Sequence, residues 1–346
     1  LHAACMSTPW SPGSSSASHL ALSRLPILGT FFMSIERRAA IDIGTNTILL
    51  LIAEVETDGV PRVGRVVHDE QNIVRLGQGV AKSRVFTPEA MERARACLAR
   101  CRETCMRHGV DPAAVRVVAT SASRDAANSG EFYDKIHRDL GFIVRIIAGE
   151  EEACLSFAGG LLEGQDPLKT AVLDIGGGST EFVTAQNSSG GPLKVRGESI
   201  DMGSVRAKDL FLPTTPYAKG DLEHMERELR GAWSRLSPGL QKELRTKEWV
   251  GVAGTVTTLA AVALNLKTFD TVRLHGFQLD RRMVGDLYGA LAALTPEQRA
   301  ANPAIGEGRA DVIVPGAAIL LTAMEAFDRA AITVSVRGLR FGVVLA

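Results

Sequence analysis

The sequence predicts an α/β protein made of two similar lobes that face each other across a cleft. The first observation is a short pattern that occurs twice, Ala-Ile-Asp-Ile-Gly-Thr-Asn-Thr at 40–47 and Val-Leu-Asp-Ile-Gly-Gly-Gly-Ser-Thr at 172–180. In each copy an apolar run ends in Asp and leads into a turn of small and polar residues. The second observation is that strand patterns alternate with helix patterns after each copy. Because the second copy begins near the middle of the chain, we predict a duplicated fold with an interdomain ligand site.

The first half is predicted to begin with strands and to continue with alternating helices and strands. The Gly44–Thr47 turn separates two apolar runs, and Thr87-Pro88 before Glu89 is typical of a helix start. Gly109 can end that helix. We expect Ser121 or Ser123 to cap a helix that carries Arg124 and Asn128. The predicted strands are 39–43, 48–55, 62–69, 115–119 and 143–147. The helix that begins at 88 is expected to reach 108, and a further helix is expected at 149–162.

The second half repeats this order after the Gly176–Thr180 turn. Its predicted strands are 171–175, 181–185, 193–200, 249–253 and 332–336, and its predicted helices are 204–212, 220–236, one after Gly254-Thr255, 280–293, 296–300 and 308–327. We therefore assign residues 33–157 to the first lobe and 158–346 to the second. Residues 1–32 are rich in Ser, Pro and Ala, and we expect them to be a disordered extension before Met33.

Composition limits the classes of partner. The formal net charge is zero, which argues against a general binder of nucleic acid or of membrane surfaces. No apolar stretch reaches the roughly 20 residues that a membrane span needs. Cys97, Cys101 and Cys105 recur at four-residue spacing, which predicts a buried thiol stripe on one helix face rather than a metal site. Because the five cysteines have no framework spacing, we expect a cytoplasmic protein.

The two turns are candidate phosphate-binding loops. Backbone N–H groups and short hydroxyls in such turns can hold an anion, and glycine allows a phosphate oxygen to approach. An ordinary hairpin turn explains the first turn alone equally well, whereas the pair favours phosphate binding. Gly254 and Thr255 form a third candidate, a strand followed by a helix N-terminus. The residues concerned in the two turns are Gly44, Thr45, Asn46, Thr47, Gly176, Gly177, Gly178, Ser179 and Thr180.

Acidic residues stand beside these turns. Asp42 and Asp174 end strands where Mg²⁺ could be held, and Glu181 follows the second turn directly. Each could instead stabilise its turn. The run 150–152 consists of three Glu residues at a helix start, where acids complement the helix dipole or where one could act as a general base. Arg124 could hold a phosphate or pair with an acid, and the residues alone leave both choices open.

Taken together, these motifs resemble the exopolyphosphatase and guanosine pentaphosphate phosphohydrolase (Ppx/GppA) family. The resemblance extends from residue 39 to the C-terminus, and its order of motifs is highly specific. The motifs are 42–47, Ala-Thr-Ser-Ala-Ser-Arg at 119–124 with Asn128, Gly-Glu-Glu-Glu-Ala at 149–153, 174–181, Gly-Thr at 254–255, Arg-Leu-His-Gly at 273–276 and Arg-Ala-Asp-Val-Ile at 309–313.

The resemblance implies a fold and an activity. The fold is the actin-like, Hsp70-like and sugar-kinase-like ATPase fold, with two ribonuclease H-like lobes. The activity is removal of the terminal phosphate from inorganic polyphosphate, or alternatively from pppGpp, with Mg²⁺ or Mn²⁺. Glu152 falls on the family's general base. Asp174 and Glu181 match its metal and water-positioning residues. From their place in the sequence we add Asp42 as a further metal ligand and Arg124 as a catalytic cation. We also expect a homodimer.

Two departures from the family pattern stand out. Phe341 lies where many relatives have Glu, and the helical C-terminal domains of longer relatives do not follow. We expect a short form that favours short chains or is less processive. A kinase of the same fold remains an alternative, although the cluster of glutamates fits activation of water better. A non-catalytic actin-like filament protein, which would need polymerisation surfaces, also remains open.

Overall fold

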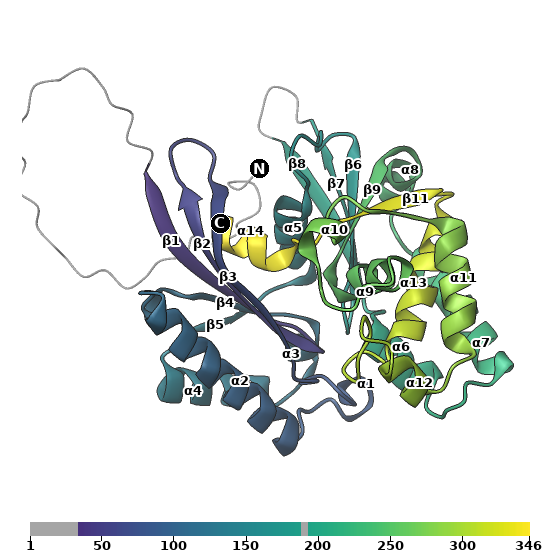
Figure 1. The fold of residues 1–346 in the computed structure, drawn as a ribbon, viewed down its shortest axis with the longest axis horizontal. Coiled ribbons are helices and arrows are strands. Elements are labelled where there is room, and N and C mark those ends of the chain that lie inside the picture. The colour runs from purple at the N-terminus through teal and green to yellow at the C-terminus, as the bar shows by residue number, and fades with distance from the viewer. Residues whose placement is uncertain (1–33, 188–192) are drawn as a thin grey trace, which may run out of the picture.

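The computed structural model describes residues 34–187 and 193–346 and places them in two α/β lobes (Figure 1). Each lobe is built on one mixed sheet, with five strands in the first and six in the second. The predicted duplicated α/β fold is therefore confirmed. The extension expected at 1–32 lies outside the described residues.

The first sheet has the order β3-β2-β1-β4-β5. Its first three strands are antiparallel, and β4 and β5 then run parallel to β1. The bounds are β1 Ile35–Ile43, β2 Thr47–Glu56, β3 Arg62–Ile73, β4 Arg116–Ala119 and β5 Val144–Ile146. The helices of this lobe are α1 Val80–Ser83, α2 Pro88–Arg107, α3 Ser121–Asp125 and α4 Ser129–Leu140, with a 3₁₀ turn at Pro112–Ala114.

The second sheet has the order β10-β11-β9-β6-β7-β8. Its antiparallel strands β6, β7 and β8 repeat the arrangement of β1, β2 and β3, and β9 is again parallel to the first of them. The strands are β6 Thr170–Ile175, β7 Thr180–Gln186, β8 Lys194–Ile200, β9 Glu248–Val252, β10 Gln278–Asp280 and β11 Ala331–Val334. The helices are α6 Ser204–Phe211, α7 Lys219–Trp233, α8 Pro238–Thr246, α9 Ala253–Ala263, α10 Thr271–Leu274, α11 Arg281–Ala292, α12 Pro296–Ala300 and α13 Ile313–Ala326.

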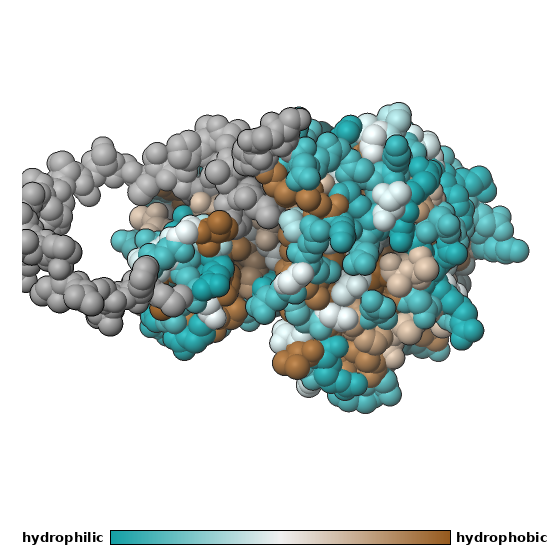
Figure 2. Space-filling view, turned by 90° about the horizontal axis from the view of Figure 1, so that it is seen from above, coloured by the Kyte–Doolittle hydropathy of each residue, from teal (hydrophilic) through white to brown (hydrophobic). Residues whose placement is uncertain are grey.

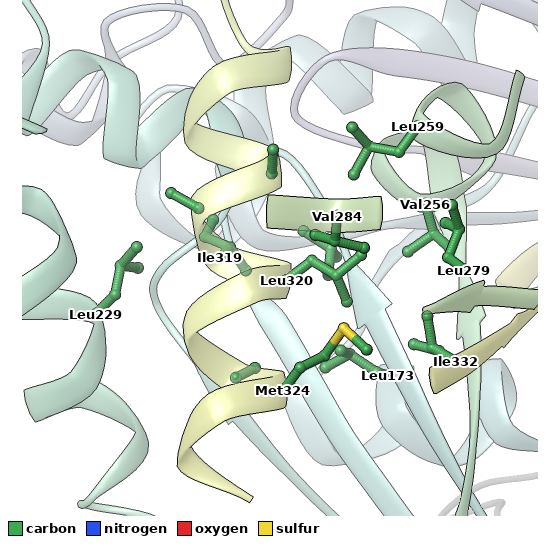
Figure 3. Packing of buried hydrophobic residues seen from close by; sticks show 14 of the residues in the cluster. Leu173, Leu229, Val256, Leu259, Leu279, Val284, Ile319, Leu320, Met324 and Ile332 are labelled. Carbon is green, nitrogen blue, oxygen red and sulfur yellow. The ribbon is translucent and has the colours of Figure 1, made fainter. Parts of the chain in front are cut away.

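Each lobe has its own apolar core. In the second lobe, α13 is buried along most of its length, and Ile319, Leu320 and Met324 pack with residues of the sheet and of α11 (Figure 3). In the first lobe, α2 packs on the sheet with its apolar face, which includes Cys97 and Cys101. The predicted buried thiol stripe is confirmed, since Cys105 is buried as well.

Two further helices lie between the sheets. Helix α5 (Gly149–Gly160) packs on the second sheet through Ala153 and Phe157 and on α14 through Leu155. Helix α14 (Leu339–Leu345), the last of the chain, returns to the first sheet, where it lies beside β1 and β2 (Figure 1). The division at residue 157 stays a prediction, and the final helix packs with the first lobe.

The structure corrects several local predictions. Arg124 and Asn128 do not share a helix, because α3 ends at Asp125 and the Asn128 side chain instead bonds the backbone of Phe86. Neither Ser121 nor Ser123 caps α3, whose N-cap position is Thr120. Gly254-Thr255 is not a loop before a helix but part of the first turn of α9. The helices α1, α8, α10 and α14 and the strand β10 were not predicted. Of these, α1, α10 and β10 are too short to show a period.

One face of the molecule shows how polar and apolar residues are distributed on its surface. Hydrophilic residues cover most of the second lobe on the face in Figure 2, with apolar residues in small patches. Among the described helices, none combines the length and the hydropathy that crossing a bilayer would require.

Candidate active site

A cavity of about 530 Å³ lies between the two lobes. Both repeated turns line it, as do Glu152 of α5, the first turn of α9 and the segment 336–340. The site thus collects residues from the two sequence halves. This is the interdomain position that the repeat predicts.

The two turns have the same backbone geometry. The N–H of Gly44 donates to the carbonyl of Thr47 at 2.9 Å, and the N–H of Gly176 donates to that of Ser179 at 3.1 Å. Each turn joins two antiparallel strands, β1 to β2 and β6 to β7. The sequence repeat is therefore a structural repeat.

The turn carbonyls are engaged by neighbouring backbone, and several turn amides are not. In the first turn, Thr45 and Asn46 accept hydrogen bonds from the segment 74–77. In the second, Gly176, Gly177 and Gly178 accept from the segment 203–206. The amides of Thr45, Asn46, Gly177, Gly178 and Ser179 donate to no acceptor in 34–187 or 193–346. Amides left free beside a cavity suit an anion such as phosphate.

The glycines of the second turn also let the lobes approach each other. A Cβ on Gly177 would lie 2.9 Å from Cβ of Thr45. A Cβ on Gly178 would lie 2.7 Å from Oγ1 of Thr45 and 2.4 Å from Oγ of Ser121. Access for a phosphate oxygen is one reason for these glycines. The structure adds tight contact between the two turns.

Glu152 lines the cavity and is 7% exposed. Arg124 donates to its Oε2 at 2.8 Å and to the carbonyl of Ile147 at 2.9 Å. Arg124 therefore pairs with an acid, the second of the two roles considered for it, and it does not itself line the cavity. Burial raises the pKa of Glu152 to about 7, although the Arg124 guanidinium opposes this rise. A buried carboxyl with a pKa near neutrality is suited to general base catalysis.

The three glutamates at 150–152 have different environments. Glu150 is exposed, Glu151 pairs with Arg145 at 2.5 Å, and only Glu152 lines the cavity. The structure thus separates the candidate base from its neighbours, which sequence spacing could not do.

Asp174 and Glu181 lie directly opposite each other on β6 and β7. Ser156 donates to Oδ2 of Asp174 at 2.5 Å, and Ser199 donates to Oε1 of Glu181 at 2.6 Å. Asp174 lines the cavity, whereas Glu181 is fully buried and does not. Burial raises the pKa of both carboxyls, and repulsion from Glu152 and Asp174 adds to the rise at Glu181.

The first lobe supplies one acid at the equivalent place. Asp42 lines the cavity, and its partner across the hairpin is Leu49 where the second lobe has Glu181. Burial, followed by repulsion from Glu152 and Asp174, raises the pKa of Asp42 well above its usual range. The two copies of the repeat are thus alike in backbone and unlike in charge.

These acids fit a divalent cation. Oδ1 of Asp42 and Oε2 of Glu181 are buried and have no hydrogen-bond partner in the structure. Within the described chain no three His, Cys, Asp or Glu side chains are grouped closely enough to hold a metal by themselves. Mg²⁺ requires only one or two carboxylates when substrate phosphates and water complete its shell. The donor set therefore suits a cation shared with a bound phosphate.

The guanidinium group of Arg309 lies at the start of α9. Arg309 was not among the predicted site residues. Gly254 and Thr255 line the cavity, and a Cβ on Gly254 would lie 1.9 Å from a guanidinium nitrogen of Arg309. Burial lowers the pKa of Arg309 to about 10. Its side chain donates no hydrogen bond to any described residue and so remains available to an anion. The only signal in the sequence was the motif at 309–313.

The remaining predicted residues divide between the cavity and its surroundings. Thr47 and Ser179 line the cavity. Thr180 does not, and its hydroxyl donates to the carbonyl of Met202 at 2.7 Å. Other lining residues that the sequence did not single out are Thr120, Ser121, Ser204, Arg337 and Arg340.

Known proteins match this chain over most of its length. The family model described as Ppx/GppA phosphatase family matches residues 52–346. Exopolyphosphatase 2 of Mycobacterium tuberculosis (strain CDC 1551 / Oshkosh) is 37% identical over 326 residues, which cover 90% of this chain and 99% of that protein.

Solved structures of exopolyphosphatase-like proteins also match this chain. The crystal structure of an exopolyphosphatase-like protein is 32% identical with a TM-score of 0.79, covering 89% of this chain and 96% of the other. The crystal structure of an exopolyphosphatase from Cytophaga hutchinsonii ATCC 33406 is 28% identical with a TM-score of 0.76. The match covers 89% of this chain and 96% of the other.

Proposed function

The chain belongs to the Ppx/GppA phosphatase family, and on this premise we propose that it is an exopolyphosphatase, which hydrolyses the terminal phosphate of inorganic polyphosphate. The observation that carries the proposal is the pairing of two amide-lined turns with one buried glutamate in a single cavity. A chain of phosphates offers anionic oxygens to both turns. A base with a pKa of about 7 then needs only a water molecule beside the last phosphorus.

The reaction is an in-line displacement at the terminal phosphorus. Glu152 accepts a proton from water as the water oxygen bonds to phosphorus, and the bridging P–O bond breaks towards the shortened chain. The ion pair with Arg124 orients the Glu152 carboxylate. The turn amides and Arg309 stabilise negative charge on the phosphoryl oxygens. Positioning and electrostatics supply most of the rate in such transfers.

We propose Mg²⁺ or Mn²⁺ as the cofactor, held by Asp42 and Asp174. Glu181, buried behind Asp174, would add negative charge and fix its neighbour rather than line the cavity. When bound, the ion would neutralise charge on the phosphate oxygens and contribute to orienting the water. The unpartnered Oδ1 of Asp42 supports this choice.

Phosphate release from polyphosphate, pppGpp and ATP, measured side by side with and without Mg²⁺, tests the proposal. We expect Mg²⁺-dependent release from polyphosphate. A kinase would instead consume ATP only when an acceptor is present. A filament protein would release no phosphate from polyphosphate, and either result would rule out the proposed activity.

Hydrolysis of pppGpp is the second candidate. Phe269 lines the cavity and is 59% exposed, so an aromatic face is available to a nucleobase at this site. Inorganic polyphosphate has no group that would use such a face. A higher kcat/KM for pppGpp than for polyphosphate would favour this reading.

Two further proposals concern the whole protein. A homodimer rests on the family resemblance, and a cytoplasmic location rests on that resemblance and on cysteine usage. Light scattering coupled to size exclusion tests the first, and subcellular fractionation tests the second.

A further inference from the structure

Phe341 packs in the apolar core beside two arginines of the cavity. It is 4% exposed and belongs to the cluster that joins α14 to the first sheet. The guanidinium carbon of Arg340 lies 5.0 Å from the centre of its ring, and that of Arg337 lies 5.6 Å from it. Both distances are in the range of cation–π attraction. One buried ring thus contacts two arginines that line the cavity.

Arg340 is partly neutralised by an acid. It donates two hydrogen bonds of 2.8 Å to Asp69 of β3, and both residues line the cavity. Its charge also lowers the pKa of Asp42 against the larger effects that raise it. Arg340 therefore lies towards the acidic end of the cavity.

Arg337 has a weaker acidic neighbour. Its nearest carboxylate, Glu163, is 3.7 Å away and 89% exposed. Its guanidinium donates no hydrogen bond to any residue in the described ranges. Its charge adds to the effect of burial, which lowers the pKa of His275. Because its one acidic neighbour among the described residues is exposed, Arg337 is open to an anion.

We propose that Arg337 and Arg340, positioned by the Phe341 ring, form a subsite for phosphate groups of the substrate chain beyond the one that is cleaved. A glutamate at position 341 would place a carboxylate beside both guanidinium groups and reduce their pull on phosphate. Phenylalanine leaves both charges available while it anchors α14 in the core. The proposal rests on the proposed function, because it assumes a linear polyphosphate in the cavity.

The test compares short and long substrates. Dissociation constants for tripolyphosphate and for long-chain polyphosphate are measured by calorimetry in a Glu152→Gln background, which prevents turnover. We expect Arg337→Gln to weaken long-chain binding about ten-fold, as loss of a charge-assisted contact to phosphate should, and to change tripolyphosphate binding less than about two-fold. Arg282→Gln is the matched control, since the Arg282 side chain is 91% exposed on α11 and does not line the cavity.

Phe341→Leu removes the aromatic contact with the two arginines while it keeps an apolar side chain in the core. Leucine keeps the site apolar, so melting temperature is compared first. In the otherwise native enzyme we expect KM for long chains to rise while kcat stays unchanged. The double variant Arg337→Gln/Phe341→Leu should lose less long-chain affinity than the sum of the two single losses, because the ring acts partly through Arg337.

The outcomes are distinct. Equal effects of Arg337→Gln on both chain lengths, or no effect on long chains, would overturn the subsite. Fully additive losses would overturn the positioning role of Phe341. If the native enzyme released no phosphate but the chain-length difference in binding persisted, the subsite would stand and the exopolyphosphatase activity would fail.

Discussion

Glu152 is the residue on which the proposed chemistry depends. It is the acid of the 150–152 run that lines the cavity, and Arg124 fixes one of its oxygens. Burial disfavours the charged carboxylate, which raises the pKa of Glu152 to about 7. This environment, and not its position in a glutamate run, makes it a candidate base.

Replacing Glu152 by Gln should lower kcat about 10²–10⁴-fold, because the amide cannot accept the proton from water. Substrate affinity should change little, since the turns and Arg309 hold the phosphates. Steady-state phosphate release measures both quantities. Glu150→Gln is the control, because Glu150 is exposed at the same helix end. Near-normal kcat in Glu152→Gln would show that another group is the base.

The pH dependence should follow the ionisation of Glu152. The base is active when deprotonated, so kcat/KM at saturating Mg²⁺ should rise as pH increases through about 7. The Arg124 charge lowers this pKa, and Arg124→Gln should therefore move the acidic limb to higher pH. Arg145→Gln should leave the limb in place, because Arg145 pairs with Glu151. An unshifted limb in Arg124→Gln would contradict the assignment.

At the scale of elements, the close packing of α5 on α14 positions the catalytic helix. A Cβ on Gly159 would lie 2.2 Å from the carbonyl oxygen of Gly338, and one on Gly342 would lie 2.0 Å from that of Leu155. Both obstructing atoms belong to the backbone, so no change of side-chain rotamer can relieve the clash. Glycine is required here because two helix backbones approach each other.

Gly159→Ala should destabilise the protein by about 1–3 kcal/mol or more, since overpacking forces the helices apart. Urea unfolding gives the free energy. Gly289→Ala on α11 is the matched control, because a Cβ there meets nothing within 4 Å. In that helix interior alanine should stabilise by about 0.5–1 kcal/mol. Equal effects of the two substitutions would show that α5 and α14 can shift apart without cost.

At the scale of the molecule, several contacts hold the lobes together around the cavity. Arg206 of α6 donates to Asp125 at 2.5 Å and to Oγ of Ser121 at 3.1 Å, both on α3 of the first lobe. Arg75 donates to Asp311 at 3.0 Å on another side. Together with the contact of Thr45 on Gly177, these bonds fix the distance between the turns.

Gly177→Ala should therefore weaken phosphate binding and stability together, because its Cβ would press on Thr45 across the lobes. We expect a loss of about 1–3 kcal/mol in the free energy of unfolding. Adding Thr45→Gly removes the obstructing atoms and should restore part of that loss. Calorimetric melting of the single and double variants measures this. A Gly177→Ala protein with full stability but no binding would instead favour the simpler reason, a blocked approach of phosphate.

The sequence by itself determined the repeat, most elements and the composition of the site. Apolar periods and turn residues are local signals, so β1, β2, α2, β6 and β7 were predicted near their observed bounds. The two turns and Glu152 were identified because glycine and acid placement is visible in the chain order, aided by the family resemblance.

Only the tertiary structure decided which of these residues share the cavity and which support it. Thr180 ends the second turn and Glu181 follows it, yet both side chains are fully buried and neither lines the cavity. Arg309 and Arg337 reach the cavity from segments distant in sequence from both turns. Their proximity depends on how helices and sheets pack over long sequence separations, and no local pattern encodes that distance.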